Sequence, residues 1–311
     1  SMAEWQWPDE IRYLASSPIS HAAGFLLIPT VINGGRVYLI PGFNPDQVLD
    51  LGERERVNTL FLVPTMIYVL MDHPRTREAD LSSIESIIYA SAPMSPARLE
   101  EALQLFGPVM MQAYGQTECI HLTVMRKEEH RLDRPGRLAS CGRPPAGVRM
   151  VLLDGQGEEV PQGEIGEVCI RSAAAMHGYW KRPEETAETL KGGWLHTGDL
   201  AYRDEEGFYY LVDRSKDMII SGGFNVYPRE VEDVLTAHPD VAMAAVIGVP
   251  DEKWGEKVLA VVVLRPGADI EPGELNELVR EKKGAIQAPK QLEFAAQLPL
   301  TALGKTDKKV L

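Results

Sequence analysis

The sequence predicts a mixed α/β fold: a mostly parallel sheet with flanking helices, then a small β-rich region and a separate α+β unit. Three patterns indicate this architecture. Strand-like and helix-like segments alternate from residue 35 to residue 113. After about residue 147 short strands and glycine-rich turns take over, and beyond Arg214 apolar strands and amphipathic helices form a compact unit. Strands that alternate with helices pack as a parallel sheet covered on both faces.

The first region contains segments rich in apolar and β-branched residues, which are typical of buried strands. They lie at residues 36–40, 59–63, 84–90 and 108–113. Helices are expected between them at residues 45–55, 65–72 and 96–106. The last helix is the best marked, because Ser95 is placed as its N-cap, Pro96 opens its first turn and Gly107 ends it.

The rest of the chain divides into two further regions. Short strands are expected at residues 148–153, 167–171 and 208–212. The C-terminal unit is expected to contain helices at residues 227–235 and 273–283 and strands at residues 241–249 and 258–264. A domain boundary is predicted at residues 215–216, so that residues 1–214 and 215–311 form two domains.

Composition excludes several functional classes. The 311 residues have a net charge of −13, which argues against nucleic acid or anionic lipid as the main partner. The three cysteines are widely spaced and lack metal-ligand spacing, which is typical of reduced core thiols in a cytosolic protein. No apolar run approaches the length of a membrane span and no signal peptide is apparent, so a cytoplasmic location is expected.

Tyr114-Gly115-Gln116-Thr117-Glu118 is the first stretch with evident chemical capacity. It follows an apolar segment directly, and open α/β sheets bind ligands at the carboxyl ends of their parallel strands. A tyrosine offers a flat ring, a threonine offers a hydroxyl for a phosphate oxygen, and a glutamate offers a hard oxygen ligand for Mg²⁺. A polar turn with a capping threonine explains the same five residues equally well.

Two glycine-containing stretches follow. In Thr197-Gly198-Asp199 the carboxylate can accept both hydroxyls of a ribose, and the glycine lets a ligand approach the backbone. An Asx-turn is the ordinary alternative. Gly222-Gly223, behind the charged run 213–217, gives a backbone that can lie against a thin ligand chain, although such charge runs are usually solvated linkers.

Gly304-Lys305-Thr306 is similar to the end of a phosphate-binding loop, but the rest of that motif is missing. The motif needs a glycine five residues before its Gly-Lys pair, and Pro299, which has no N–H, stands there instead. No helical pattern follows before the last residue. We therefore expect Lys305 to be a mobile point charge in a loop.

Six motifs together resemble the adenylate-forming superfamily, in particular its acyl-CoA synthetase branch. The resemblance covers essentially the whole chain, and it is specific because all six occur in family order. The motifs are Ser91-Ala92-Pro93, residues 114–118, Gly163-Glu164-Ile165-Gly166-Glu167 with Gly178-Tyr179-Trp180, Thr197-Gly198-Asp199, residues 214–232 and Gly304-Lys305. The fold that this implies is an AMP-binding large domain with a small α+β lid.

The resemblance implies a site for ATP or AMP. Tyr114 would stack on adenine, Thr117 would touch the α-phosphate and Glu118 would hold Mg²⁺. Asp199 and Arg214 would bind the ribose hydroxyls. The further nucleotide-binding positions that it implies are Ser91, Ala92, Pro93, Gly115 and Gln116.

The same resemblance implies a moving lid. Lys305 would be the adenylation lysine, acting with Thr117 and Glu118, and Lys216 would be the hinge. The positions beside the pantetheine of coenzyme A would be Ser221, Gly222 and Gly223. The candidates for lining the acyl pocket are His21, Gly24, Val63 and Gln112, although His21 alone would be read as an ordinary half-buried histidine.

The chain departs from the family in one large respect. The Ser/Thr/Gly-rich loop that grips the β- and γ-phosphates normally precedes the segment around His21, and nothing in this sequence matches it. Residues 1–214 are therefore expected to be the C-terminal part of the large domain, and residues 215–311 the whole lid. With Ser1-Met2 interpreted as a cloning remnant, deliberate truncation is the simplest account, and cleavage or a truncated gene are alternatives.

For a full-length parent the resemblance implies a two-step ligase of fatty acid metabolism. A carboxylic acid and MgATP would give acyl-adenylate and pyrophosphate, and the thiol of coenzyme A would then displace AMP. The alternatives are an enzyme that loads a carrier-protein thiol, and a non-catalytic nucleotide-binding fragment. Medium-chain fatty, aryl and alicyclic acids all remain open, and we expect the present chain to be inactive alone and to form homo-oligomers.

Overall fold

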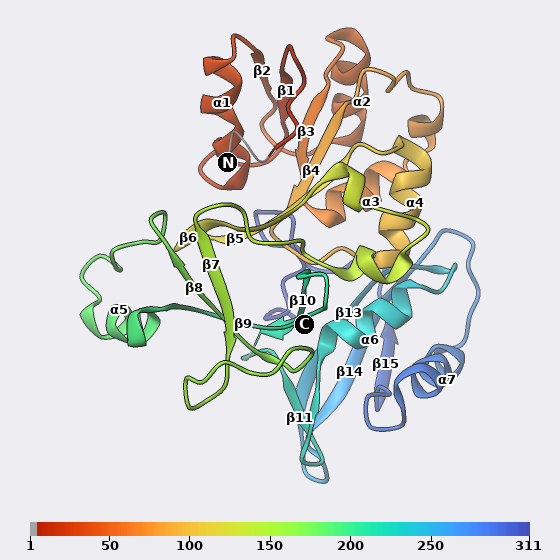
Figure 1. Ribbon diagram of the computed structural model, residues 1–311. Coiled ribbons are helices and arrows are strands. Elements are labelled where there is room, and N and C mark those ends of the chain that lie inside the picture. The colour runs from red at the N-terminus through yellow and green to blue at the C-terminus, as the bar shows by residue number, and fades with distance from the viewer. Residues whose placement is uncertain (1–4, 215) are drawn as a thin grey trace.

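The computed structural model describes residues 5–214 and 216–311, and Figure 1 shows how its sheets and helices are arranged. Ser1-Met2 and Ser215, the first residue of the expected lid, lie outside the described residues. A six-stranded sheet is followed by a four-stranded sheet and then by a five-stranded sheet. The mixed α/β architecture expected from the sequence is thereby confirmed.

The six-stranded sheet has the order β2-β1-β3-β4-β5-β6, and only the β5–β6 pair in it is antiparallel. Its strands are β1 (Arg12–Ala15), β2 (Arg36–Leu39), β3 (Thr59–Leu62), β4 (Ser86–Ala90), β5 (Met110–Gln116) and β6 (Cys119–Met125). The helices of this domain are α1 (Leu27–Ile32), α2 (Pro45–Arg54), α3 (Pro64–Asp72) and α4 (Pro96–Phe106).

Both faces of this sheet are covered, because successive side chains of a strand point to opposite sides. On β4, Ile87 and Tyr89 join a buried core with side chains of α2, α3 and α4. Ile88 points the other way, into a core with Trp5 and with Leu26 of the short 3-10 helix Ala22–Leu26. The carboxyl ends of β4 and β5 are thus held between two apolar layers.

The start of α4 differs from the sequence expectation. Ser95 occupies the N-cap position, but its side chain makes no capping hydrogen bond. Instead, the hydroxyl of Thr236 in the C-terminal domain donates to Oγ of Ser95 at 2.8 Å, and the N–H of Ser95 donates to the hydroxyl of Tyr68 at 2.8 Å. The hydroxyl predicted to cap a helix therefore joins two domains.

The second sheet is antiparallel and has the order β10-β9-β8-β7. Its elements are β7 (Val148–Leu153), β8 (Gly166–Ser172), α5 (Pro183–Thr189), β9 (Leu195–Arg203) and β10 (Tyr209–Arg214). Cys119, Cys141 and Cys169 are buried free thiols, as expected from their spacing. β9 was not identified from the sequence, although it contains the Thr197-Gly198-Asp199 motif.

The C-terminal sheet has the order β12-β11-β14-β13, with β15 parallel to β14. Its strands are β11 (Ile219–Ser221), β12 (Phe224–Val226), β13 (Val241–Asp251), β14 (Gly255–Leu264) and β15 (Gln291–Phe294), and its helices are α6 (Pro228–Thr236) and α7 (Pro272–Lys283). Val231 of α6 and Leu275 of α7 pack into one core with Val258 and Val262 of β14. Within the described part of the chain, every helix is too short or too polar to cross a membrane.

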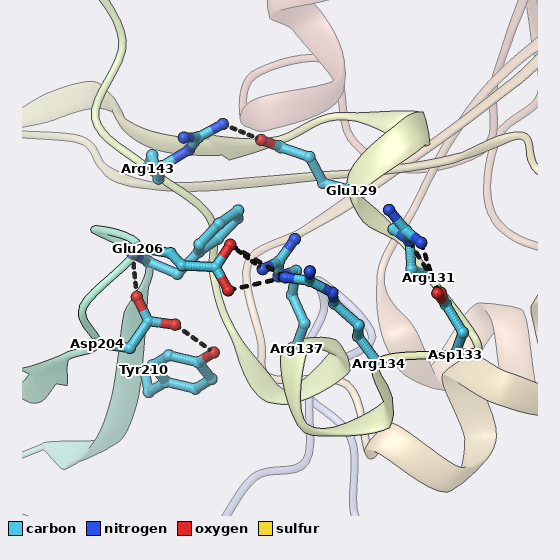
Figure 2. Close-up of polar contacts among 10 residues, drawn as sticks. Glu129, Arg131, Asp133, Arg134, Arg137, Arg143, Asp204, Glu206 and Tyr210 are labelled. Carbon is cyan, nitrogen blue, oxygen red and sulfur yellow. Dashed lines mark hydrogen bonds and ion pairs between the residues drawn. The ribbon is translucent and has the colours of Figure 1, made fainter.

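A polar cluster braces the turn of the β9–β10 hairpin, as Figure 2 shows. Arg134 and Arg137 donate to the carboxylate of Glu206 in this turn, at 2.8 and 2.5 Å. The ring of Phe208 lies between Arg137 and Arg143, whose guanidinium carbons are 4.3 and 4.6 Å from its centroid. The hairpin is therefore anchored at one end, while its other end enters the site described next.

Candidate active site

The most densely bonded polar group at the meeting point of the first two sheets is the carboxylate of Asp199 on β9, whose residue is only 7% exposed. The hydroxyl of Tyr114 and the side-chain amide of Gln116, both on β5, donate to its Oδ2 at 2.6 and 2.8 Å. Nε of Arg214, at the end of β10, lies 3.2 Å from Oδ1. Three strands from two sheets therefore converge on one carboxylate.

The Tyr114 stretch forms part of a strand, whereas the sequence suggested a loop after the strand. β5 runs from Met110 to Gln116, and only Thr117 and Glu118 form the turn to the antiparallel β6. The ladder shifts register between Tyr114 and Gln116. A Cβ at Gly115 would lie 1.8 Å from the carbonyl oxygen of Ile120, so the close pairing of this hairpin requires glycine there.

Tyr114 is suited to remain a hydrogen-bond donor. Burial, followed by the negative charge of Asp199, raises the pKa of its hydroxyl well above the ordinary value. The hydroxyl therefore stays protonated at neutral pH and donates to the carboxylate. This contact orients the aromatic ring at the end of β5.

Ser91-Ala92-Pro93 lies beside Tyr114 at the same edge of the sheet. Ala90 and Ala113 are partners in the parallel β4–β5 ladder, so the residues that follow each of them emerge side by side. Ser91 has a φ of +75°, in the left-handed region that non-glycine residues rarely adopt. Such strain is found preferentially where chain geometry serves a site.

Lys305 is brought to the same region by the C-terminal domain. The hydroxyl of Thr65, at the start of α3, donates to the carbonyl oxygen of Gly304. The turn itself is closed, because the N–H of Thr301 donates to the carbonyl oxygen of Lys305 at 2.8 Å. Burial and then the nearby charge of Arg214 lower the pKa of Lys305. The lysine expected to be a free-moving charge thus lies in a closed turn, half-buried, within electrostatic range of Arg214.

Glu118 lies at the rim, in the turn between β5 and β6. The hydroxyl of Tyr179 donates to its Oε1 at 2.6 Å, which leaves Oε2 available. One carboxylate oxygen at the edge of a site is compatible with Mg²⁺, which usually keeps most of its waters and takes one or two protein carboxylates. Thr117 beside it is exposed. Tyr179 was not assigned a role from the sequence, because the two residues lie 61 positions apart.

Two of the four acyl-pocket candidates, His21 and Gln112, lie on opposite faces of the six-stranded sheet. Gln112 lies near Tyr89, whose hydroxyl is 3.2 Å from its Oε1, on the face that α3 and α4 cover. His21 is exposed, beside the 3-10 helix that covers the opposite face, and its Nδ1 lies 2.9 Å from the hydroxyl of Ser20. Their part in an acyl pocket remains a prediction.

The Gly222-Gly223 turn also lies apart from Asp199. It joins β11 to β12 at the far end of the C-terminal domain, in the lower part of Figure 1. The N–H of Gly222 donates to the carbonyl oxygen of Trp254 at 2.8 Å. A Cβ at Gly222 would lie 2.9 Å from the Trp254 ring, which accounts for glycine at this position. Lys216 is exposed in the segment between β10 and β11.

Comparison with known proteins gives matches to two families. The AMP-binding enzyme family matches residues 1–180, and the AMP-binding enzyme C-terminal domain matches residues 230–305. A medium/long-chain-fatty-acid–CoA ligase, FadD8 of Mycobacterium tuberculosis, is 48% identical over all of this chain and 55% of its own length. A feruloyl-CoA synthase of Amycolatopsis sp is 42% identical over 98% of this chain and 62% of its own length.

Solved structures agree with these matches. The amide bond synthetase McbA from Marinactinospora thermotolerans has a TM-score of 0.90 and 43% identity, over 96% of this chain and 61% of that one. ATP-bound MatB from Rhodopseudomonas palustris has a TM-score of 0.89 and 31% identity, over 99% of this chain and 61% of that one. The chain therefore spans 55% to 62% of the length of the two curated relatives named above.

Proposed function

The chain belongs to the AMP-binding enzyme family, and from this premise we propose that it forms the nucleotide site and lid of an acyl-CoA synthetase. The observation that supports this best is the convergence of Tyr114, Gln116 and Arg214 on Asp199, with Lys305 close to Arg214. An aromatic ring, a buried carboxylate and a cation are the groups needed to bind adenine, ribose and an α-phosphate.

In the first half-reaction a carboxylate oxygen attacks the α-phosphorus of ATP, and pyrophosphate leaves. Tyr114 and residues 91–93 would enclose adenine, and Asp199 with Arg214 would bind the ribose hydroxyls. Asp199 has acceptor capacity left for one ribose hydroxyl, since a carboxylate accepts about four hydrogen bonds and three donors contact it here. Glu118 would hold Mg²⁺, which neutralises phosphate charge when bound.

Lys305 would bring the two anionic reactants together. The substrate carboxylate and the α-phosphate repel each other, and a cation placed between them lowers that repulsion most in the transition state. The contact between Gly304 and Thr65 supports this role, because it anchors the turn of Lys305 to the large domain.

In the second half-reaction a thiolate attacks the acyl carbonyl and AMP leaves. Lys305 has no function in this step, so a rotation of the lid about Lys216 would remove it and present the Gly222-Gly223 turn to the pantetheine. The Gly222-Gly223 turn lies between β11 and β12, apart from β9 with Asp199 (Figure 1), and this is consistent with a lid orientation that serves the first step.

The acceptor that we propose is coenzyme A. The relatives include CoA ligases, which favours this acceptor. A carrier-protein thiol is the second candidate, because a fatty acid–[acyl-carrier-protein] ligase of Streptomyces coeruleorubidus is 36% identical over 96% of the chain. The structural likeness to an amide bond synthetase makes an amine worth testing in the same assay.

The experiment is a pyrophosphate-release screen on a protein extended to the length of its relatives, with the present chain assayed beside it. The acid panel would contain medium- and long-chain fatty, aryl and alicyclic acids, each with coenzyme A, a carrier protein, an amine or no acceptor. We expect acid-dependent pyrophosphate release by the extended protein, thioester formation with coenzyme A, and no turnover by the present chain. Acid-independent release, or no release with any acid, would contradict the proposal.

A further inference from the structure

The Asp199 segment of β9 interrupts the regular ladder with β8. Glu167 pairs with Leu200 and Cys169 pairs with His196, so that Thr197, Gly198 and Asp199 all lie opposite the single residue Val168. A bulge of this kind removes backbone groups from the ladder and leaves them to find other partners. Gly198, with a φ of +71°, supplies the left-handed residue of the bulge.

Side chains replace the missing ladder bonds. The hydroxyl of Thr197 donates to the carbonyl oxygen of Val168 at 2.8 Å and accepts from the N–H of Asp199 at 3.1 Å. The side-chain amide of Gln116 donates to the carbonyl oxygen of Thr197 at 2.8 Å. The bulge is therefore held in one geometry by polar contacts from the neighbouring strand β8 and from β5 of the first sheet.

Glu167 contacts this bulge through both of its oxygens. Oε1 accepts the N–H of Gly198 at 3.0 Å, and Oε2 lies 2.8 Å from Nδ1 of His196. Sγ of Cys169 lies 3.3 Å from the same nitrogen. Because burial raises the pKa of this thiol to about 12, the carboxylate is the stronger acceptor for an Nδ1 proton. One carboxylate thus ties together the residues one and three positions before Asp199.

We propose that Glu167 is a positioning residue, which fixes the bulge so that the Asp199 carboxylate faces the nucleotide ribose. The inference rests on the ribose role proposed for Asp199. Glu167 itself does not reach that carboxylate: it acts through the Gly198 N–H and the His196 ring. Without it, the bulge would lose the hydrogen bond from the Gly198 N–H and the contact of the His196 ring, and a glycine held by fewer contacts has a wider range of backbone angles. Asp199 would then lose its fixed direction.

The test uses the present chain and compares its affinity for AMP and for 2′,3′-dideoxyAMP, which lacks both ribose hydroxyls. Hydrogen bonds to a charged group are strong, so we expect the wild type to prefer AMP by roughly tenfold or more. Glu167→Ala should reduce this preference to about threefold or less. Glu167→Gln keeps an oxygen for the Gly198 N–H and should restore most of it. Titration calorimetry measures both affinities, and a urea titration shows that each variant is folded.

Two further variants complete the design. Glu164→Ala removes an exposed carboxylate just before β8 and should leave the preference unchanged. Glu167→Asp keeps the charge but is too short to reach both partners. If the alanine variant does not fold, the AMP preference of Glu167→Asp is measured in its place. A wild type that binds both nucleotides equally, or neither, would overturn the proposed nucleotide site. A wild type that discriminates, with Glu167→Ala or the folded Glu167→Asp discriminating equally well, would overturn the positioning role alone.

Discussion

A buried carboxylate such as Asp199 needs hydrogen-bond donors, because removal from water otherwise disfavours its charged form. The donors come from Tyr114, Gln116 and Arg214. Each is suited to the task for a different reason: the tyrosine stays protonated, the amide is neutral and directional, and the guanidinium is a cation with several N–H donors. The site therefore holds a negative charge without exposing it to bulk water.

Lys305 is expected to act in only one of the two proposed half-reactions. Lys305→Ala, in a protein extended to the length of its relatives, should slow adenylate formation by on the order of 10²–10³-fold, because a cation is lost from the transition state. Thioester formation from supplied acyl-adenylate should be largely unaffected. Pyrophosphate release and a coupled thioester assay measure the two steps separately.

The matched control for this change is Lys309→Ala, which removes an exposed lysine from the same segment and should leave both steps unchanged. Equal losses in the two half-reactions would contradict the role given to Lys305.

His130 should make the stability of the protein depend on pH. Burial lowers its pKa to about 4, while the hydroxyl of Tyr89 lies 3.0 Å from its Nε2. The unfolded chain takes up this proton near pH 6.5, its ordinary pKa. The native state is therefore favoured above pH 6.5, and this contribution is lost as the pH falls from about 6.5 to about 4. The full contribution of His130 to the free energy of unfolding is on the order of 3 kcal/mol.

Urea titrations of the wild type and His130→Gln across this range test the effect. The variant should have a lower free energy of unfolding at pH 7 and a flatter profile between pH 6.5 and pH 4. Asp233, whose pKa burial raises to about 6, acts in the opposite direction but is common to both proteins. The exposed His177→Gln is the control, and a profile for His130→Gln as steep as that of wild type would contradict the prediction.

The candidate site could be predicted from the sequence only where a motif is local. Tyr114, Asp199 and Arg214 stood out because each lies in a short recognisable stretch. The structure places Tyr114 and Arg214 around the carboxylate of Asp199. Glu167 and Tyr179 were cited only as members of motifs, and no role was assigned to them. Their partners lie 31 and 61 positions away, and only the packed chain shows such pairs.

At the scale of elements, one set of polar contacts joins the C-terminal domain to α3 and α4. Arg265, after β14, donates to Glu101 of α4 at 2.7 Å and lies 3.8 Å from Asp72 of α3. The fully buried Arg98 of α4 pairs with the same two carboxylates, at 2.5 and 2.7 Å. With the Thr236–Ser95 hydrogen bond, these contacts hold the C-terminal domain where the turn of Lys305 meets α3.

Removing the side chain of Arg265, which pairs with Glu101 and Asp72, should weaken the attachment of the C-terminal domain to α3 and α4. Arg265→Ala leaves Arg98 paired, and the lost contacts are partly exposed, so the cost is about 0.5–1 kcal/mol. A change of that size shifts the population of lid orientations by roughly two- to fivefold. The exposed Lys216 lies in the connecting segment and is a target for trypsin, so cleavage there should accelerate by a similar factor.

Arg280→Ala is the control for this variant, since the ion pair of Arg280 with Glu277, at 3.1 Å, lies within α7. A rate of cleavage after Lys216 that is the same in wild type and Arg265→Ala would show that the network does not set the position of the lid.

Element prediction succeeded where a segment is long and periodic. The helices α2, α3, α4, α6 and α7 begin and end within about two residues of their expected bounds. Short strands such as β11 and β12 were missed, because three residues show too little alternation to be recognised. Ser95 was assigned a capping role by its local pattern, whereas a tertiary contact with Thr236 takes its hydroxyl. Local propensity can place an element but does not specify its partners.

At the scale of the whole molecule, separate apolar cores lie beneath the sheets, and the polar site lies where the first two sheets meet the lid. Each sheet has a core of its own, and Met243 of β13 also packs against the core of the first sheet. The division expected at residues 215–216 is compatible with this, since Arg214 ends the second sheet and Ile219 begins the third. The boundary remains a prediction.

One face of the molecule is apolar and uncovered. Ile28, Val31 and Ile32 share one side of α1 and are 70%, 65% and 75% exposed, and Leu39 on the neighbouring β2 is 59% exposed. β2 is also the edge strand of the six-stranded sheet, so its outer backbone groups have no strand partner among residues 5–214 and 216–311. An apolar face next to an open edge promotes association between chains.

We therefore expect the present chain to self-associate as its concentration rises, and the double variant Ile28→Ser, Ile32→Ser to remain smaller at the same concentration. Both serines would face water, so the change should lower self-association without unfolding the domain. Val310→Ser, which alters a side chain that is also 70% exposed but lies at the other end of the chain, is the matched control. Sedimentation velocity over a concentration series measures the effect, and a wild-type chain that stays monomeric throughout would show that this face does not drive association.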